Sequence, residues 1–347
     1  MNKNTIAELF INDDIIEKYV MGLNDVSKHL AELISINGFI DDFTKKETFC
    51  GLPIIKSQDI PANAVVISCS LAIWPVTVSK LLSTNKVKHV SILDLMNDGR
   101  LDIRVPYLDS FRLDYKNNSE FYDLLRKKLQ DEKSKILLDD IISFRVHGNL
   151  EVMEKYEVNV KTQYFEDFLN FVDGSVFVDV GGFDGATSIE FIKRCPNYGH
   201  VYVLEPSEIN FKSCEINLSS YKNVTVIKKG LSNKNQILSF SDDLGSRSGV
   251  TKEGNVEIEV DMLDNLVQDS TTFIKMDIEG GESDAIRGAA QTILDDHPIL
   301  AISVYHKPTD IRKIFEQINS LRKDYNVYLR HYTEGTDETV MFFIPVE

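Results

Sequence analysis

The stretch FVDVGGFDGATSIEF, residues 177–191, constrains the fold more than any other part of the sequence. Its apolar opening predicts a buried strand, the glycine-rich segment 181–185 a tight turn, and residues 186–191 the start of a helix. A strand that passes through a glycine turn into a helix is a frequent nucleotide cradle in open α/β sheets. The stretch therefore predicts an α/β fold with a nucleotide-type ligand at this turn.

Strands and helices continue to alternate after this turn. Strands are predicted at 201–205, 224–227, 273–277 and 299–304, with short polar-alternating pieces at 237–240 and 256–260 as an insertion that extends or covers an edge. An amphipathic helix is predicted over 311–321. The chain ends with two predicted strands, VYLRHY and TVMFFIP, which are joined by the short polar loop TEGTDE. Two strands joined by so short a loop must be antiparallel. A parallel sheet closed by such a hairpin resembles class I methyltransferases, whereas dinucleotide dehydrogenases normally stay parallel.

The first 130 residues predict a smaller α/β domain that is Rossmann-like but degenerate. Helical material is expected to about residue 43, followed by strands at 64–70 and 87–95 around a helix near 76–82. The turn SLAIWP contains no glycine, so a phosphate cannot approach its backbone, and Trp74 is expected in the core. We therefore expect this domain at 1–130 without a nucleotide site, a helical linker at 131–170 and a second α/β domain at 171–347.

Charge and cysteine content exclude several classes of protein. The chain has 347 residues with 38 basic and 54 acidic side chains, a net charge of −16, and no long basic stretch, which argues against a nucleic-acid partner. Its four cysteines form no CxxC pair, which fits a reducing cytoplasm. The N-terminus has no apolar core of the signal-peptide type, and the longest uncharged run, 60–79, contains two prolines. We expect a cytoplasmic protein without a membrane span.

The residues of the turn discriminate between nucleotides. A dinucleotide fingerprint needs a second glycine where this chain has Phe183, and the Gly-Lys-Ser/Thr of a P-loop is absent. Asp179 and Asp184 repel phosphate but suit a ligand that carries an ammonium and a sulfonium group. Glu205, twenty residues beyond Gly185 at the end of the next strand, can accept hydrogen bonds from both hydroxyls of a ribose. Together with the terminal hairpin, these residues predict S-adenosylmethionine as the cofactor.

Five motifs carry a resemblance to a known family. They are, in order, QYFEDFLNFVDGSVFVDVGGFDGATSIEF, VYVLEPS, FIKMDIEGGESDAIRGA, ISVYHKPTDI and LRHYTEGTDETVMFFIP, and the resemblance as a whole runs from about residue 133 to the C-terminus. In these motifs the chain resembles the FkbM family of S-adenosylmethionine-dependent methyltransferases, although GGFDG replaces the more usual Gly-Ala opening of the turn. The resemblance implies a Rossmann-like domain that methylates a hydroxyl, often on sugars or polyketide-type metabolites. The N-terminal part is only loosely covered, and we expect it to hold the acceptor specificity.

Candidate site residues follow from the rule that ligands lie beyond the carboxyl ends of the strands. The expected cofactor-binding residues are Asp179, Gly181, Asp184, Gly185, Glu205 and Asp277. His306 in VYHK is the preferred general base, because an imidazole titrates near neutral pH. Asp277 and Glu279 are the competing catalytic residues, and they are alternatively ligands for a divalent cation such as Mg²⁺.

Two other functions stay open from the sequence alone. One is an NAD-dependent sugar-nucleotide oxidoreductase or dehydratase, against which Phe183 and the terminal hairpin count. The other is a non-catalytic ligand-binding protein with a methyltransferase-like fold, which the complete set of acidic residues with His306 disfavours. The preferred acceptor is a small molecule or glycan precursor, and a homo-oligomer stays open as the assembly.

Overall fold

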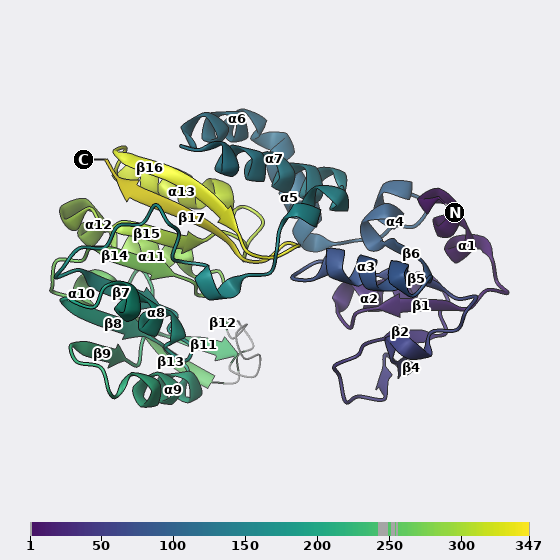
Figure 1. Cartoon of the computed structure of the whole chain (residues 1–347), viewed down its shortest axis with the longest axis horizontal. Coiled ribbons are helices and arrows are strands. Elements are labelled where there is room, and N and C mark those ends of the chain that lie inside the picture. The colour runs from purple at the N-terminus through teal and green to yellow at the C-terminus, as the bar shows by residue number, and fades with distance from the viewer. Residues whose placement is uncertain (1, 242–248, 251–253, 255, 347) are drawn as a thin grey trace. The chain divides into compact units, whose positions relative to one another are not determined.

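A computed structural model describes residues 2–241, 249–250, 254 and 256–346 (Figure 1). The chain divides into two compact units, and neither is a single continuous segment. Unit 1 comprises Met1–Ser119, Ile136–Val160 and Tyr332–Asp337, and unit 2 comprises Glu120–Lys135, Lys161–His331 and Glu338–Glu347. The domain boundaries expected near residues 130 and 170 stay a prediction.

Unit 2 is built on a seven-stranded sheet in the order β16-β17-β15-β14-β7-β8-β9. Its parallel strands are β7 (Val176–Val180), β8 (His200–Leu204), β9 (Val224–Ile227), β14 (Phe273–Met276) and β15 (Ile299–Ser303). The C-terminal hairpin of β16 (Tyr325–His331) and β17 (Thr339–Pro345), yellow in Figure 1, closes one edge, because β17 pairs antiparallel with both β15 and β16. The predicted Rossmann-like sheet with an antiparallel terminal hairpin is confirmed.

Most helices of unit 2 come directly after one of its strands. The helices are α6 (Ser119–Lys128), α8 (Ala186–Arg194), α9 (Glu208–Leu218), α10 (Leu263–Leu266), α11 (Glu282–Gly288), α12 (Ala290–Asp296) and α13 (Asp310–Leu321). The predicted amphipathic helix is α13, which buries Ile311, Ile314 and Ile318. In the core, Phe177 of β7 stacks on Phe273 of β14 with ring centroids 4.7 Å apart. Parallel pairing continues from Phe273 with Phe177 to Met276 with Val180, which places the carboxyl ends of β14 and β7 side by side next to the glycine turn.

The predicted insertion forms a small sheet of its own within unit 2. Its strands are β10 (Gly230–Leu231), β11 (Gln236–Ser241), β12 (Gly249–Val250) and β13 (Val256–Asp261), in the order β10-β13-β11-β12. The alternating polar pattern of 237–240 and 256–260 is that of the antiparallel pair β11 and β13. Instead of extending the main sheet, these strands pair with one another.

Unit 1 contains a second sheet in the order β3-β4-β2-β1-β5-β6. Its strands are β1 (Lys18–Met21), β2 (Gly38–Ile40), β3 (Thr48–Phe49), β4 (Leu52–Ile55), β5 (Val65–Ser68) and β6 (Lys88–Ser91). Its helices are α1 (Lys3–Asn12), α2 (Asp25–Leu33), α3 (Pro75–Thr84), α4 (Ile92–Asp98), α5 (Pro106–Asn117) and most of α7 (Glu132–His147). The expectation of helix throughout the first 43 residues is wrong, because the short buried strands β1 and β2 lie there.

The glycine-free turn of unit 1 is occupied by another part of the chain. Trp74 in this turn is 48% exposed, so its expected place in the core is wrong. The loop Tyr332–Asp337 packs against the turn, where the backbone amide of Glu334 donates to the carbonyl of Ile73 at 3.0 Å. The carboxylate of Glu334 accepts from the amide and hydroxyl of Thr77 at 2.7 and 2.6 Å, beside the N-terminus of α3. A carboxylate of the protein itself thus satisfies the helix end at which an anionic ligand would bind.

None of the helices in the described part of the chain combines the length and apolar composition that crossing a membrane requires.

Candidate active site

The glycine turn after β7 is dictated first by its packing against neighbouring strands. Gly181 has a φ of +84°, and a Cβ there would lie 2.0 Å from the carbonyl oxygen of Asp277. A Cβ on Gly182 would lie 2.2 Å from Cγ1 of Val203 on β8. Gly185, with a φ of +82°, is the N-cap of α8. These glycines therefore let the turn lie directly against β8 and the residue that follows β14.

Glu205 lies directly after β8 and receives two backbone hydrogen bonds. Its Oε2 accepts from the amide of Phe183 and its Oε1 from the amide of Ser207, both at 2.9 Å. Burial raises the pKa of Glu205, and these two hydrogen bonds act against the rise. Each oxygen of an ionised carboxylate can accept a further hydrogen bond. The carboxyl group therefore fits the predicted contact with the two hydroxyls of a ribose.

Asp179 pairs with a buried cation that the sequence analysis missed. Its carboxylate is fully buried, accepts from the hydroxyl of Ser188 at 2.8 Å and lies 3.1 Å from Nζ of Lys275. Lys275 also donates to the carbonyl of Gly181 at 2.6 Å. Burial lowers the pKa of Lys275, but the charges of Asp179 and Asp277 outweigh it, so the pKa is raised and the ammonium stays charged. The sequence did contain a sign of this buried ion pair, namely a lysine within the otherwise apolar strand FIKM.

Asp184 lies in the turn itself and contacts the start of the following helix. Its Oδ1 accepts from the amide of Ala186 at 3.0 Å. The side chain of Asn217 on α9 donates to the carbonyl of Asp184 at 2.9 Å, which ties the turn to that helix. Asp184 is half-buried, so of the two acidic residues in this motif it is the more accessible to a ligand.

The three predicted catalytic residues come together at the carboxyl ends of β14 and β15. Nε2 of His306 lies 3.3 Å from Oδ1 of Asp277 and 3.7 Å from Oε2 of Glu279. On the other side of the ring, Nδ1 lies 2.8 Å from Oε1 of Glu282, which is 1% exposed. Parallel pairing of β14 with β15 places these chain segments side by side. We call Asp277, Glu279, Glu282 and His306 the carboxylate–imidazole cluster.

Glu282 was missed because the turn before it determines its position. Glu279 and Gly280 have φ values of +52° and +90°, so the chain reverses between β14 and α11. The reversal brings the amide of Ile278 to 3.0 Å and that of Gly280 to 3.4 Å from Oε1 of Glu282. A left-handed conformation at a residue other than glycine costs free energy and is frequent at functional sites.

Asp277 is held by two tyrosines. The hydroxyl of Tyr164, from the segment before β7, donates to Oδ2 at 2.6 Å, and the hydroxyl of Tyr305 donates to Oδ1 at 3.4 Å. Burial and the charge of Asp277 raise the pKa of Tyr164 well above its usual value, so the phenol stays protonated and remains a donor. Tyr164 lies in an irregular stretch of the sequence, where no periodic pattern indicated its role.

The charges of the cluster change the protonation expected for His306. Burial lowers the pKa of His306, but its contact with Glu282 and the charges of Glu282, Asp277 and Glu279 outweigh burial and raise the pKa to about 10. Burial raises the pKa of Asp277, but the charges of His306 and Lys275 outweigh it and lower the pKa. In this arrangement the ring is protonated and Asp277 is ionised at neutral pH. The sequence had suggested a neutral imidazole near working pH.

Residues 179–328 match the family model described as the methyltransferase FkbM domain. The chain carries an FkbM methyltransferase domain. It is a methyltransferase, and the match spans the glycine turn, Glu205 and the whole carboxylate–imidazole cluster.

A solved structure of the FkbM type shows the same fold over nearly the whole chain, and two further solved structures match about half of it. The methyltransferase FkbM from Methylobacillus flagellatus KT has a TM-score of 0.75 and 24% sequence identity, with 98% of each chain covered. Fibrillarin from Aeropyrum pernix, crystallised with S-adenosyl-L-methionine, has a TM-score of 0.36 and 10% identity over 53% of this chain and 73% of its own. The precorrin-6y C5,15-methyltransferase from Geobacter metallireducens GS-15 has a TM-score of 0.32 and 18% identity, over 50% and 80%. No curated protein matched the chain.

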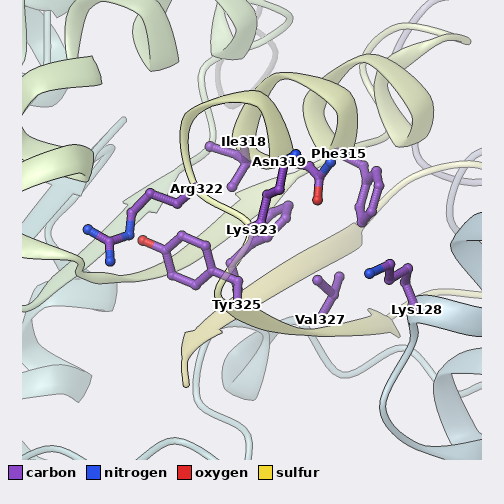
Figure 2. Close-up of a pocket in the computed structure, with 9 residues that line it drawn as sticks. Lys128, Phe315, Ile318, Asn319, Arg322, Lys323, Tyr325 and Val327 are labelled. Carbon is purple, nitrogen blue, oxygen red and sulfur yellow. The ribbon is translucent and has the colours of Figure 1, made fainter. Parts of the chain in front are cut away.

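Two surface pockets of unit 2 lie away from the cluster. Figure 2 shows one of about 20 Å³, in which Phe315 and Asn319 of α13 face Tyr325 and Val327 of β16. Tyr325 begins β16, which runs in the same direction as β15, so this pocket lies near the edge where the strands begin. A larger groove of about 660 Å³ lies between α11 and α13. Neither pocket is lined by a residue of the cluster.

Proposed function

We propose that this protein is an S-adenosylmethionine-dependent O-methyltransferase that acts in the cytoplasm on a hydroxyl of a sugar, glycan precursor or similar metabolite. The observation that carries the proposal is that the cofactor-type turn and the carboxylate–imidazole cluster share the carboxyl edge of one sheet. The turn follows β7, Glu205 follows β8, and the cluster follows β14 and β15. This is the crevice in which an open α/β sheet binds its ligands.

The residues of the turn fit the cofactor. In this proposal Glu205 accepts hydrogen bonds from the ribose, and Gly181, Asp184 and Gly185 hold the methionine part. Asp179 stabilises the turn indirectly, because it pairs with Lys275, which donates to the carbonyl of Gly181. When bound, S-adenosylmethionine supplies a methyl group that its sulfonium makes reactive.

The protein must orient the acceptor and receive its proton. When the acceptor oxygen takes the methyl group, its hydroxyl proton would pass to a residue of the carboxylate–imidazole cluster. Asp277 is ionised, and 23% of its side chain is exposed, so it can accept that proton. Because its lowered pKa makes it a weak base, we assign more of the rate enhancement to orientation and water exclusion. His306, Tyr164 and Tyr305 hold its carboxylate in place.

Calorimetry and mass spectrometry test the proposed function. We expect S-adenosylmethionine and its demethylated product to bind, and NAD not to bind. Binding of NAD alone would favour the oxidoreductase. Deletion of the gene should lower the mass of a cell glycan or metabolite by one CH₂ group, and the purified protein should restore that mass. Tight cofactor binding with no such mass difference would favour a non-catalytic binding protein.

Glu205→Gln and Glu205→Ala are expected to weaken S-adenosylmethionine binding by about tenfold or more, because hydrogen bonds to a charged acceptor each contribute about 1.5–3 kcal/mol. Calorimetry at pH 7 measures the change. Glu208→Gln is the matched control, since Glu208 lies on the exposed first turn of α9 and pairs with Lys212. Unchanged affinity in both Glu205 variants would contradict the ribose assignment.

The same contact predicts a pH dependence. Burial raises the pKa of Glu205 in the free protein, and the ribose contact favours the ionised carboxylate. Affinity for S-adenosylmethionine should therefore be full above that pKa and fall as the pH drops through it. The fall should begin at a higher pH than for an ordinary glutamate. Glu205→Gln should show a flatter profile between pH 7 and pH 5, and parallel profiles would contradict the role of this carboxylate.

A further inference from the structure

Two polar groups of the cluster face each other while their other atoms are held from behind. Oδ2 of Asp277 accepts from Tyr164, and Nδ1 of His306 lies against Glu282. Oδ1 of Asp277, which also accepts from the hydroxyl of Tyr305 at 3.4 Å, lies 3.3 Å from Nε2 of His306. The His306 side chain is 6% exposed, and neither ring nitrogen has a well-oriented hydrogen bond to any described residue.

The spacing of these atoms suits a bound ion. Two donors held about 2.1 Å from one metal lie about 3.0–3.4 Å apart in octahedral or tetrahedral geometry. The 3.3 Å between Nε2 and Oδ1 falls in this range, and Oε2 of Glu279 is 3.7 Å from the same nitrogen. Donor atoms of Asp277, Glu282 and His306 all lie within 4.8 Å of one another, whereas Glu279 is placed near the site by its distance to Nε2 alone.

We infer that His306 Nε2, Asp277 Oδ1 and Glu279 Oε2 form a binding site for a divalent transition-metal ion. Glu282 and Tyr164 are the outer groups that orient the imidazole and the carboxylate, as such groups do around metal ligands. The ion would displace the proton of His306, and the two carboxylates would offset the charge of the ion. The imidazole favours Zn²⁺, Mn²⁺ or Co²⁺ over Mg²⁺, which prefers oxygen ligands alone.

The purpose of this site rests on the proposed function. An ion beside Asp277 would polarise the acceptor hydroxyl and so assist a base that is weak by itself. Metal binding, however, can be measured without an acceptor or cofactor. Failure of this inference is therefore distinguishable from failure of the proposed function.

The test uses the full-length protein after chelator treatment and dialysis. Titration with Co²⁺ should give visible d–d absorption bands that Zn²⁺ abolishes and Mg²⁺ does not. His306→Ala should weaken Co²⁺ binding by about 100-fold or more, and Glu282→Gln by about 10- to 100-fold. His297→Ala is the matched control, because this histidine also lies near a carboxylate, Asp324 at 3.6 Å, at the other end of β15.

The outcomes separate the hypotheses. Loss of Co²⁺ binding in folded His306→Ala, with binding retained in His297→Ala, supports the site. Absence of Co²⁺ bands in the wild type, or equal affinity in wild type and His306→Ala, overturns it. Thiolate charge-transfer bands would place the ion at a cysteine such as the exposed Cys50 and also overturn the inference. Calorimetric binding of S-adenosylmethionine despite a negative Co²⁺ result would leave the proposed function standing.

Discussion

Replacing His306 with alanine is expected to lower methyl-transfer turnover by about 10²-fold or more, because Asp277 loses its orientation, and to change affinity for S-adenosylmethionine little. The ring is the shared centre of the cluster, since Asp277, Glu279 and Glu282 all lie within 3.7 Å of its nitrogens. Its loss removes the group that orients Asp277, whether the ring carries a proton or an ion. The cofactor turn lies after β7, outside this cluster, so cofactor binding should persist.

Turnover can be measured with the unmethylated glycan or metabolite from the gene-deletion strain and with labelled S-adenosylmethionine. His306→Gln keeps the size of the side chain and guards against a folding defect in the alanine variant. His200→Ala is the control, because His200 is the first residue of β8 and so lies where the parallel strands begin, away from their carboxyl ends. Near-full turnover in both His306 variants would show that this residue has no part in the reaction.

Much of the candidate site was predictable because central parallel strands have a simple signature. Buried on both faces, they appear as apolar runs, and the polar residue that ends each run lies at the ligand-binding edge. Glu205, Asp277 and His306 were found in this way. The reversal at Gly280 that brings Glu282 onto the ring could not be found, because a positive φ is a property of the folded turn.

Other features depend on contacts between segments distant in the sequence. Tyr164 reaches Asp277 over 113 residues, and no local pattern marks such a contact. The sequence predicted the polar loop containing Glu334 only as the connection of a hairpin, whereas its contacts with Ile73 and Thr77 bury it in unit 1. A central strand as short as β1 gives too few residues for a periodic signal.

The ion pair beneath the glycine turn predicts a large effect on stability. In Lys275→Met, the fully buried carboxylate of Asp179 loses its cation and keeps only the hydroxyl of Ser188. Breaking a buried pair by removing one partner costs about 3–5 kcal/mol of unfolding free energy, because the remaining charge is desolvated without compensation. Lys212→Met, which breaks an exposed pair with Glu208, should change stability little.

A double variant separates the ion pair from simple loss of packing. In Asp179→Asn/Lys275→Met neither partner of this pair is charged, and the asparagine oxygen can still accept from Ser188. The double variant should therefore be more stable than Lys275→Met alone, by chemical denaturation at pH 7. If the two substitutions instead destabilise additively, the lysine acts through its aliphatic packing and not through its charge. Lys275 also donates to the carbonyl of Gly181 in the glycine turn. Additive destabilisation would therefore mean that packing between β7 and β14, and not the charge of Lys275, holds this turn in its conformation.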